Sequence, residues 1–170
     1  KMSSSLDVEK YESEILSGTG KGSFIKYNSD IFFVTCNHVI QNGTNIIIKC
    51  NGMFVIDLLI DYRCKRLIEL DLAIFKISDI SADLSEINII ELEEREYNTI
   101  KYEEGHFDEH VINNLELTNN DFMDINFLTF PAITGNLDFD SRGYSGSMIF
   151  SEDKDCIGML CGQADENAFL

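Results

Sequence analysis

Short runs of β-branched and aromatic residues recur along almost the whole chain, separated by residues typical of tight turns. Two separators, Asn42-Gly43 and Asn51-Gly52, are strong signals for hairpin turns. We predict strands over residues 23–27, 31–35, 45–50, 54–60 and 72–77 and, where the pattern is less regular, over 87–92, 98–102, 111–117, 127–130, 147–150 and 157–161. Many short strands at intervals of roughly ten residues favour an all-β barrel or sandwich.

The N-terminal segment follows another pattern. Its apolar residues have a loose helical spacing: Leu6, Val8, Tyr11, Ile15 and Leu16. This spacing predicts a short N-terminal helix, which the glycines at positions 18, 20 and 22 are expected to end. The 170 residues fit one domain or two small, tightly packed halves, with residues 78–96 as the connection between the halves or as a solvated acidic loop.

The charge limits the partners that the chain can bind. With a net charge of −17, the surface repels phosphate backbones and anionic lipids, so we expect neither nucleic acid nor membrane as a partner. Neutral or basic partners remain, or the charge serves solubility alone. No apolar run approaches the roughly 20 residues that cross a bilayer.

The chain has five cysteines, an odd number, and its polar N-terminus lacks the pattern of a secretory signal. Both features indicate free thiols in a reducing compartment, so we expect a cytoplasmic protein. No pair has the Cys-x-x-Cys spacing of a zinc knuckle, and Cys36 with His38 is a poor pair of metal ligands. We therefore expect no metal and no cofactor.

Ser145 lies in a glycine-flanked segment, Arg142-Gly143-Tyr144-Ser145-Gly146-Ser147, followed by an apolar strand. A serine hydroxyl is a poor nucleophile unless a base takes its proton and N–H donors stabilise the oxyanion. Glycines allow a tight turn that aims the N–H groups of Gly143 and Ser145 at one point. Taken alone, the segment is equally well explained as a turn that enters a strand.

A base and a carboxylate are needed beside this serine. His38 follows a predicted core strand, whereas His106 and His110 lie in the acidic stretch 103–109 or next to it and are expected to be exposed. Asp71 stands at the head of an apolar strand, where a carboxylate is costly without a donor such as the His38 ring. Taken alone, His38 is also explained as a buried histidine of the core. Asp71 is also explained as an exposed aspartate at the start of a strand.

Together, the segments resemble the chymotrypsin-fold (trypsin-like) serine peptidases. Thr35-Cys36-Asn37-His38-Val39 is similar to the family's Thr-x-x-His motif, and Gly143-Tyr144-Ser145-Gly146 to its Gly-x-Ser-Gly turn. Asp71-Leu72-Ala73-Ile74-Phe75-Lys76 is similar to its aspartate segment, and Gly18 to Ile25 to the entry strand of bacterial, HtrA-like members. The order His, Asp, Ser also agrees. The family has a second glycine and then proline where Ser147 and Met148 stand here.

The resemblance implies an all-β fold of two packed, six-stranded-type antiparallel barrels, to which we add the short N-terminal helix. We expect a helical extension over residues 1–17, a first barrel with His38 and Asp71 over 18–84, and a second barrel with Ser145 over 85–170. The closest comparison is with intracellular bacterial or viral members.

The resemblance also implies a triad, with Ser145 as nucleophile, His38 as general base and Asp71 orienting the base. The oxyanion donors are the N–H groups of Gly143 and Ser145. The substrate pocket is expected near Phe139 and near Cys161, Gly162 and Gln163. Asp138 or Asp140 would favour a basic side chain there or act only as loop carboxylates.

The expected activity is endopeptidase action on a protein or peptide substrate, in an effector domain that further domains or partner subunits regulate. Two alternatives stay open at this point. One is a catalytically silent, protease-fold module that binds peptides. The other is a small all-β interaction domain in which His38 and Ser145 lie far apart.

Overall fold

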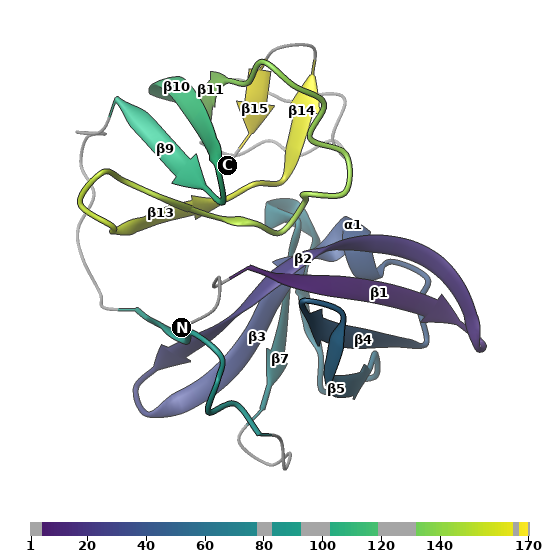
Figure 1. Ribbon diagram of the computed structural model, residues 1–170. Helices are drawn as coiled ribbons and strands as arrows, with labels where there is room; N and C mark the ends of the chain where they lie inside the picture. The colour runs from purple at the N-terminus through teal and green to yellow at the C-terminus, as the bar shows by residue number, and fades with distance from the viewer. Residues whose placement is uncertain (1–4, 78–82, 93–102, 119–131, 165–166, 170) are drawn as a thin grey trace.

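The computed structural model describes residues 5–77, 83–92, 103–118, 132–164 and 167–169, which form two antiparallel sheets packed against each other. In Figure 1 the first sheet occupies the lower half and the second sheet the upper half. No helix in these ranges has the length and apolar character that a membrane span requires.

The first sheet has the strand order β5-β4-β1-β2-β3-β7-β6, and β8 pairs with β2 in parallel. Its strands are β1 (Leu6–Glu12), β2 (Ile15–Tyr27), β3 (Asp30–Cys36), β4 (Asn45–Cys50), β5 (Met53–Leu59), β6 (Lys65–Leu67), β7 (Leu72–Lys76) and β8 (Ile90–Glu91). A one-turn helix, α1 (Asn37–Ile40), follows β3, and a 3₁₀ turn, η1 (Ile68–Leu70), precedes β7. These two short turns carry His38 and lead into Asp71.

The second sheet has the order β13-β12-β9-β10-β11-β15-β14. Its strands are β9 (Glu104–Phe107), β10 (His110–Thr118), β11 (Ala132–Asn136), β12 (Met148–Phe150), β13 (Cys156–Met159), β14 (Gly162–Ala164) and β15 (Asn167–Phe169). Ser145 lies between β11 and β12, in the segment that faces the first sheet.

In each sheet the two end strands follow one another along the chain. The end strands of the second sheet, β13 and β14, are separated along the chain by Leu160 and Cys161 alone. The end strands of the first sheet, β5 and β6, are also consecutive in the chain. When each such pair is taken as one interrupted strand, each sheet consists of six segments, with β8 as an addition to the first. The all-β, two-barrel type of fold that we expected is thus observed.

The predicted N-terminal helix is wrong. Residues 6–12 form β1, which pairs with β2 on one side and β4 on the other. Leu6 and Val8 alternate with polar residues and are buried, so the segment has the two-residue period of a strand rather than the period of a helix. The spacing up to Leu16 suggested a helix only because it ran across the turn between β1 and β2.

The glycines at positions 18, 20 and 22 do not end an element, because they lie inside β2. Their lack of a side chain serves close packing. A Cβ at Gly22 would collide with the Phe33 ring, and one at Gly20 would lie 2.7 Å from Val39 Cγ2. Gly20 therefore lets α1 pack directly onto β2, which brings α1 to the boundary between the sheets.

The predicted strand 23–27 is only the end of β2, which begins at Ile15. Most other predicted strands are observed with small shifts of their ends, and residues 45–50 match β4 at both ends. Of the predicted strand 87–92, only Ile90–Glu91 is a strand. The predicted strands at 98–102 and 127–130 lie outside the described residues. The domain boundary near residue 84 stays a prediction.

Candidate active site

His38 and Asp71 form a hydrogen-bonded pair at the boundary between the sheets. The Nδ1 atom of His38 lies 2.5 Å from Asp71 Oδ2, and the backbone N–H of His38 donates to Asp71 Oδ1 over 2.8 Å. A carboxylate only accepts, so the Nδ1 atom carries a proton, and in the neutral ring the lone pair is on Nε2. The histidine is about one-third exposed, whereas the aspartate side chain is fully buried.

The backbone around Asp71 explains why the carboxylate reaches the ring. Asp71 ends η1 in the left-handed conformation, with φ of 51°, which aspartate adopts more readily than most residues. Its carbonyl oxygen accepts the N–H of Asn37 over 2.9 Å. Backbone and side chain of this one residue thus fix the first turn of α1.

Ser145 lies in a tight turn that its flanking glycines make possible. Gly143 has φ of +87° and Gly146 has φ of +99°. The N–H of Tyr144 donates to the carbonyl of Ser141 over 2.9 Å, so residues 141–144 form a type II turn with glycine at its third position. Within the described ranges, the N–H groups of Gly143 and Ser145 have no hydrogen-bond acceptor.

The turn is anchored on the first sheet through β2. The carbonyl oxygen of Ser145 accepts the N–H of Lys21 over 2.8 Å, and a Cβ at Gly146 would collide with the Lys21 carbonyl. At Gly20, a Cβ would meet the Ser145 carbonyl at 3.1 Å as well as the Val39 side chain. The turn with Ser145 and the helix with His38 therefore meet at one point of β2.

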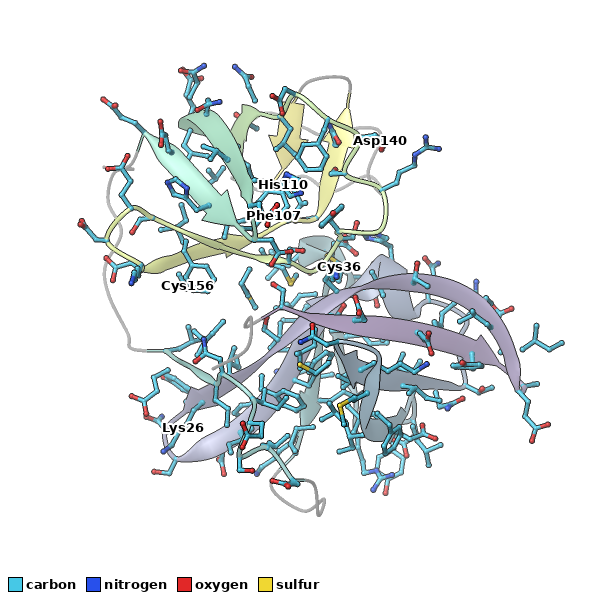
Figure 2. All side chains as sticks on the ribbon, in the orientation of Figure 1. Lys26, Cys36, Phe107, His110, Asp140 and Cys156 are labelled. Atoms are coloured by element: carbon cyan, nitrogen blue, oxygen red, sulfur yellow. The ribbon has the colours of Figure 1, made fainter. Side chains whose placement is uncertain are left out.

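We call the contacts of Lys21, Thr35 and Cys36 with the segments 145–146 and 160–161 the sheet junction. Across this junction the N–H of Lys21 donates to the Ser145 carbonyl over 2.8 Å, and the Cys36 thiol donates to the Leu160 carbonyl over 3.3 Å. Beside it, within the first sheet, the Thr35 hydroxyl donates to the Lys21 carbonyl over 2.7 Å. Figure 2 shows Cys36 at this boundary. Among the described residues, no hydrogen bond joins the Ser145 hydroxyl to His38. Such bonds are often long in the absence of substrate.

A cavity of about 610 Å³ opens beside Ser145. Its lining includes three of the predicted pocket residues, Phe139, Gly162 and Gln163. The fourth, Cys161, is not among the described lining residues. Its side chain points inward, where it packs with the core of the first sheet.

Gln163 spans one side of this cavity. Its Oε1 atom accepts the N–H of Ser141 over 2.8 Å and the Ser141 hydroxyl over 2.6 Å, while Nε2 donates to the Phe139 carbonyl over 2.8 Å. Asp140 pairs with Arg142 over 2.5 Å, and the Arg142 guanidinium lowers the pKa of Asp140. Asp138, also in the lining, is exposed.

The fold can be compared with those of known proteins. No family model and no curated protein sequence matches the chain. Solved structures do match over 98% of its length. They include the Rv3671c protease from M. tuberculosis (TM-score 0.61, 14% identity, 74% of that chain) and the NSP4 proteinase from equine arteritis virus (0.57, 12%, 70%). A serine endoprotease from Yersinia pestis also matches (0.58, 15%, 57%).

This chain has the chymotrypsin-like fold of trypsin-like serine proteases. Identities of 12–17% leave its activity to be tested on its own residues.

Within the chymotrypsin-like fold, the cysteines at the junction are buried thiols. Burial raises the pKa of Cys36 well above its ordinary value, and Cys161 and Asp71 nearby add to the increase. Burial also raises the pKa of Cys161 to about 12. None of the five cysteines, all of which lie in the described ranges, forms a disulfide bond. Because only a thiolate is a good nucleophile, neither Cys36 nor Cys161 is a candidate nucleophile.

Among the residues that the structure describes, two groups of side chains have ligand atoms close enough together to hold a metal ion. Cys36, His38 and Asp71 lie within 4.8 Å of one another, but the last two already bond each other and the thiol is held protonated. Glu104, His106 and Glu152 form the second group, away from Ser145. His106 Nε2 lies 3.5 Å from Glu104 there.

His110 and the rings around it are the part of the site region that sequence reasoning missed. We expected His110 to be exposed, but it is half-buried, and its ring stacks on Phe139 with 4.1 Å between centroids. Phe107 and His110 flank a two-residue turn and pair directly across it. The two-residue separation of Phe107 and His110 in the sequence could have indicated this contact, since residues paired across a hairpin point to the same face of the sheet.

Proposed function

We propose that this chain is a serine endopeptidase that hydrolyses peptide bonds through an acyl-enzyme. The observation that carries the proposal is the buried Asp71 carboxylate holding His38 by two hydrogen bonds, next to a turn that presents Ser145 at a cavity. This arrangement supplies a base of defined tautomer, a nucleophile and room for a substrate side chain.

The reaction begins when the Ser145 oxygen attacks the scissile carbonyl and its proton passes to His38 Nε2. The N–H groups of Gly143 and Ser145 donate to the oxyanion that forms. The C–N bond then breaks, and His38 gives the proton to the leaving amine while Asp71 stabilises the imidazolium. Water next attacks the acyl-enzyme with His38 as base, and the proton returns to the Ser145 oxygen as the ester bond breaks.

The alternative is a protease-fold module that binds peptides without cleaving them. One observation favours it: the described residues include no hydrogen bond between Ser145 and His38. Such a module would bind peptides through the same cavity, and its peptide affinity would be unchanged in Ser145→Ala.

Substrate profiling separates the two functions. We expect the wild-type protein to cleave members of a mixed peptide library and Ser145→Ala to cleave none, with a loss in the range of 10⁶-fold. Cleavage by Ser145→Ala at the wild-type rate would remove Ser145 from the mechanism. A wild-type protein that binds library peptides but leaves them intact would instead support the binding module.

A further inference from the structure

Tyr144 stands between the two residues whose N–H groups are the proposed oxyanion donors. Its carbonyl and the N–H of Ser145 belong to one planar peptide unit and point in opposite directions. Because the Tyr144 carbonyl accepts the N–H of Ser147 over 3.0 Å, the direction of the Ser145 N–H is fixed. The N–H of Tyr144 closes the type II turn that orients Gly143. The position of Tyr144 therefore sets both donors.

Three rings surround the Tyr144 side chain. Its ring meets Phe107, His110 and Phe139 edge-on, with centroid separations of 5.9, 5.4 and 5.8 Å and interplanar angles of 72°, 86° and 86°. Edge-to-face contacts depend on ring orientation, so three of them restrict a ring more than apolar packing does. We call the rings of Phe107, His110 and Phe139 the aromatic cage.

The cage joins parts of the second sheet that are distant in sequence. Phe107 and His110 come from the two ends of the β9–β10 turn, and Figure 2 shows them side by side. Phe139 comes from the loop after β11 and lines the cavity beside Ser145. Phe107 is 2% exposed and belongs to the core of this sheet. The cage is thus anchored in the core and reaches the pocket wall.

The turn has no side-chain packing at Gly143. A Cβ at Gly143 would have no heavy atom within 4 Å, so the turn is open on that side. Gln163 holds Ser141 at the start of the turn, and Tyr144 is the side chain between the two donors that packs against the second sheet.

We propose that the aromatic cage, acting on the Tyr144 ring, is the positioning device of the oxyanion hole. The inference rests on the proposed function. Tyr144 is a positioning residue, because its side chain acts on the reaction only through the backbone N–H groups beside it. No hydrogen bond of the Tyr144 hydroxyl is found among the described residues, so the ring alone is required.

The test compares Tyr144→Phe, Tyr144→Ala and the wild type on one cleaved peptide, at a temperature where all are folded by circular dichroism. Tyr144→Phe should keep kcat within about threefold. Tyr144→Ala should lower kcat by about 10²-fold, the loss expected when reacting groups are displaced by roughly an ångström. KM should change little, and affinity for a peptide boronate, which forms a tetrahedral adduct, should fall in parallel with kcat.

A matched control separates positioning from loss of stability. Phe24 and Phe33 make an edge-to-face contact in the core of the first sheet, with centroids 5.0 Å apart. Phe24→Leu should lower the melting temperature while kcat of the folded protein stays at the wild-type value. The acid limb of the pH profile of kcat/KM should be unchanged in Tyr144→Ala, since His38 and Asp71 are untouched.

A double variant tests the cage itself. His110→Ala should also lower kcat, and His110→Ala with Tyr144→Ala should lose no more than the larger single effect, since both act through one contact. If the kcat losses of the two single variants multiplied in the double variant, the proposed role of the cage would be overturned. A Tyr144→Ala protein with wild-type kcat and boronate affinity would also overturn it. A wild-type protein without any peptidase activity would overturn the proposed function together with the cage. Failure of the cage alone is distinguishable, because the wild-type protein would then still cleave the peptide.

Discussion

The two halves of the candidate site are assembled in different ways. The His38–Asp71 pair lies within one sheet, and each partner is held by backbone as well as side-chain bonds. The turn of Ser145 instead depends on contacts across the sheet junction and on two glycines with positive φ. The proposed base, His38, is therefore held within the first sheet, whereas the turn of the proposed nucleophile, Ser145, also depends on contacts between the two sheets.

The largest effect after loss of Ser145 is expected in the base half. In Asp71→Asn an amide N–H₂ can face His38 Nδ1, which moves the ring proton to Nε2 and removes the base. We expect kcat to fall by about 10⁴-fold, with the fold retained by circular dichroism. An Asp71→Asn protein within tenfold of wild-type kcat would contradict the assignment of this pair.

In the nucleophile half, Gly143→Ala tests the turn. The substitution causes strain at φ of +87° but no clash, so the turn should change type and withdraw one oxyanion donor. We expect a loss of 10²–10³-fold in kcat. Gly52→Ala is the matched control, since Gly52 has φ of +80° and equally open surroundings in a distant turn. Equal activity losses in the two variants would show that strain alone is responsible.

The junction should be sensitive to high pH through its buried thiols. The pKa of Cys161 is about 12 in the folded protein against an ordinary value of 9.0, so only the unfolded chain loses this proton between these values. Stability should be unaffected below pH 9 and fall as the pH rises through this window. Urea unfolding at pH 8 and pH 10.5 measures the decline, which should be shallower in Cys161→Ala. An identical decline in both proteins would argue against a buried junction.

The smallest effect is expected for a single hydrogen bond that lies within the first sheet, beside the junction. Thr35→Val removes the bond to the Lys21 carbonyl and should cost about 1 kcal/mol of unfolding free energy. Thr44→Val removes a similar bond, to the Tyr11 carbonyl, on the exposed side of the first sheet. We expect kcat to fall only in the Thr35 variant, by less than about tenfold. The same kcat in both variants would show that this hydrogen bond does not affect the reaction.

The sequence predicted the all-β class because strand period and turn residues are local properties. Its failure at residues 6–12 has the same origin, since a loose spacing was counted across a turn whose position only pairing with β2 and β4 fixes. The triad candidates came from motif resemblance. The buried Cys161 and the ring stack of His110 depend on contacts between distant segments, which no local pattern contains.

The central claim is that the His38–Asp71 pair activates Ser145. Its most direct test is the intact mass of the protein after reaction with a fluorophosphonate. We predict one adduct per chain, mapped to Ser145, and no adduct in either Ser145→Ala or His38→Ala. A folded wild-type protein that stays unlabelled, or a label that survives removal of the Ser145 hydroxyl, would contradict the account.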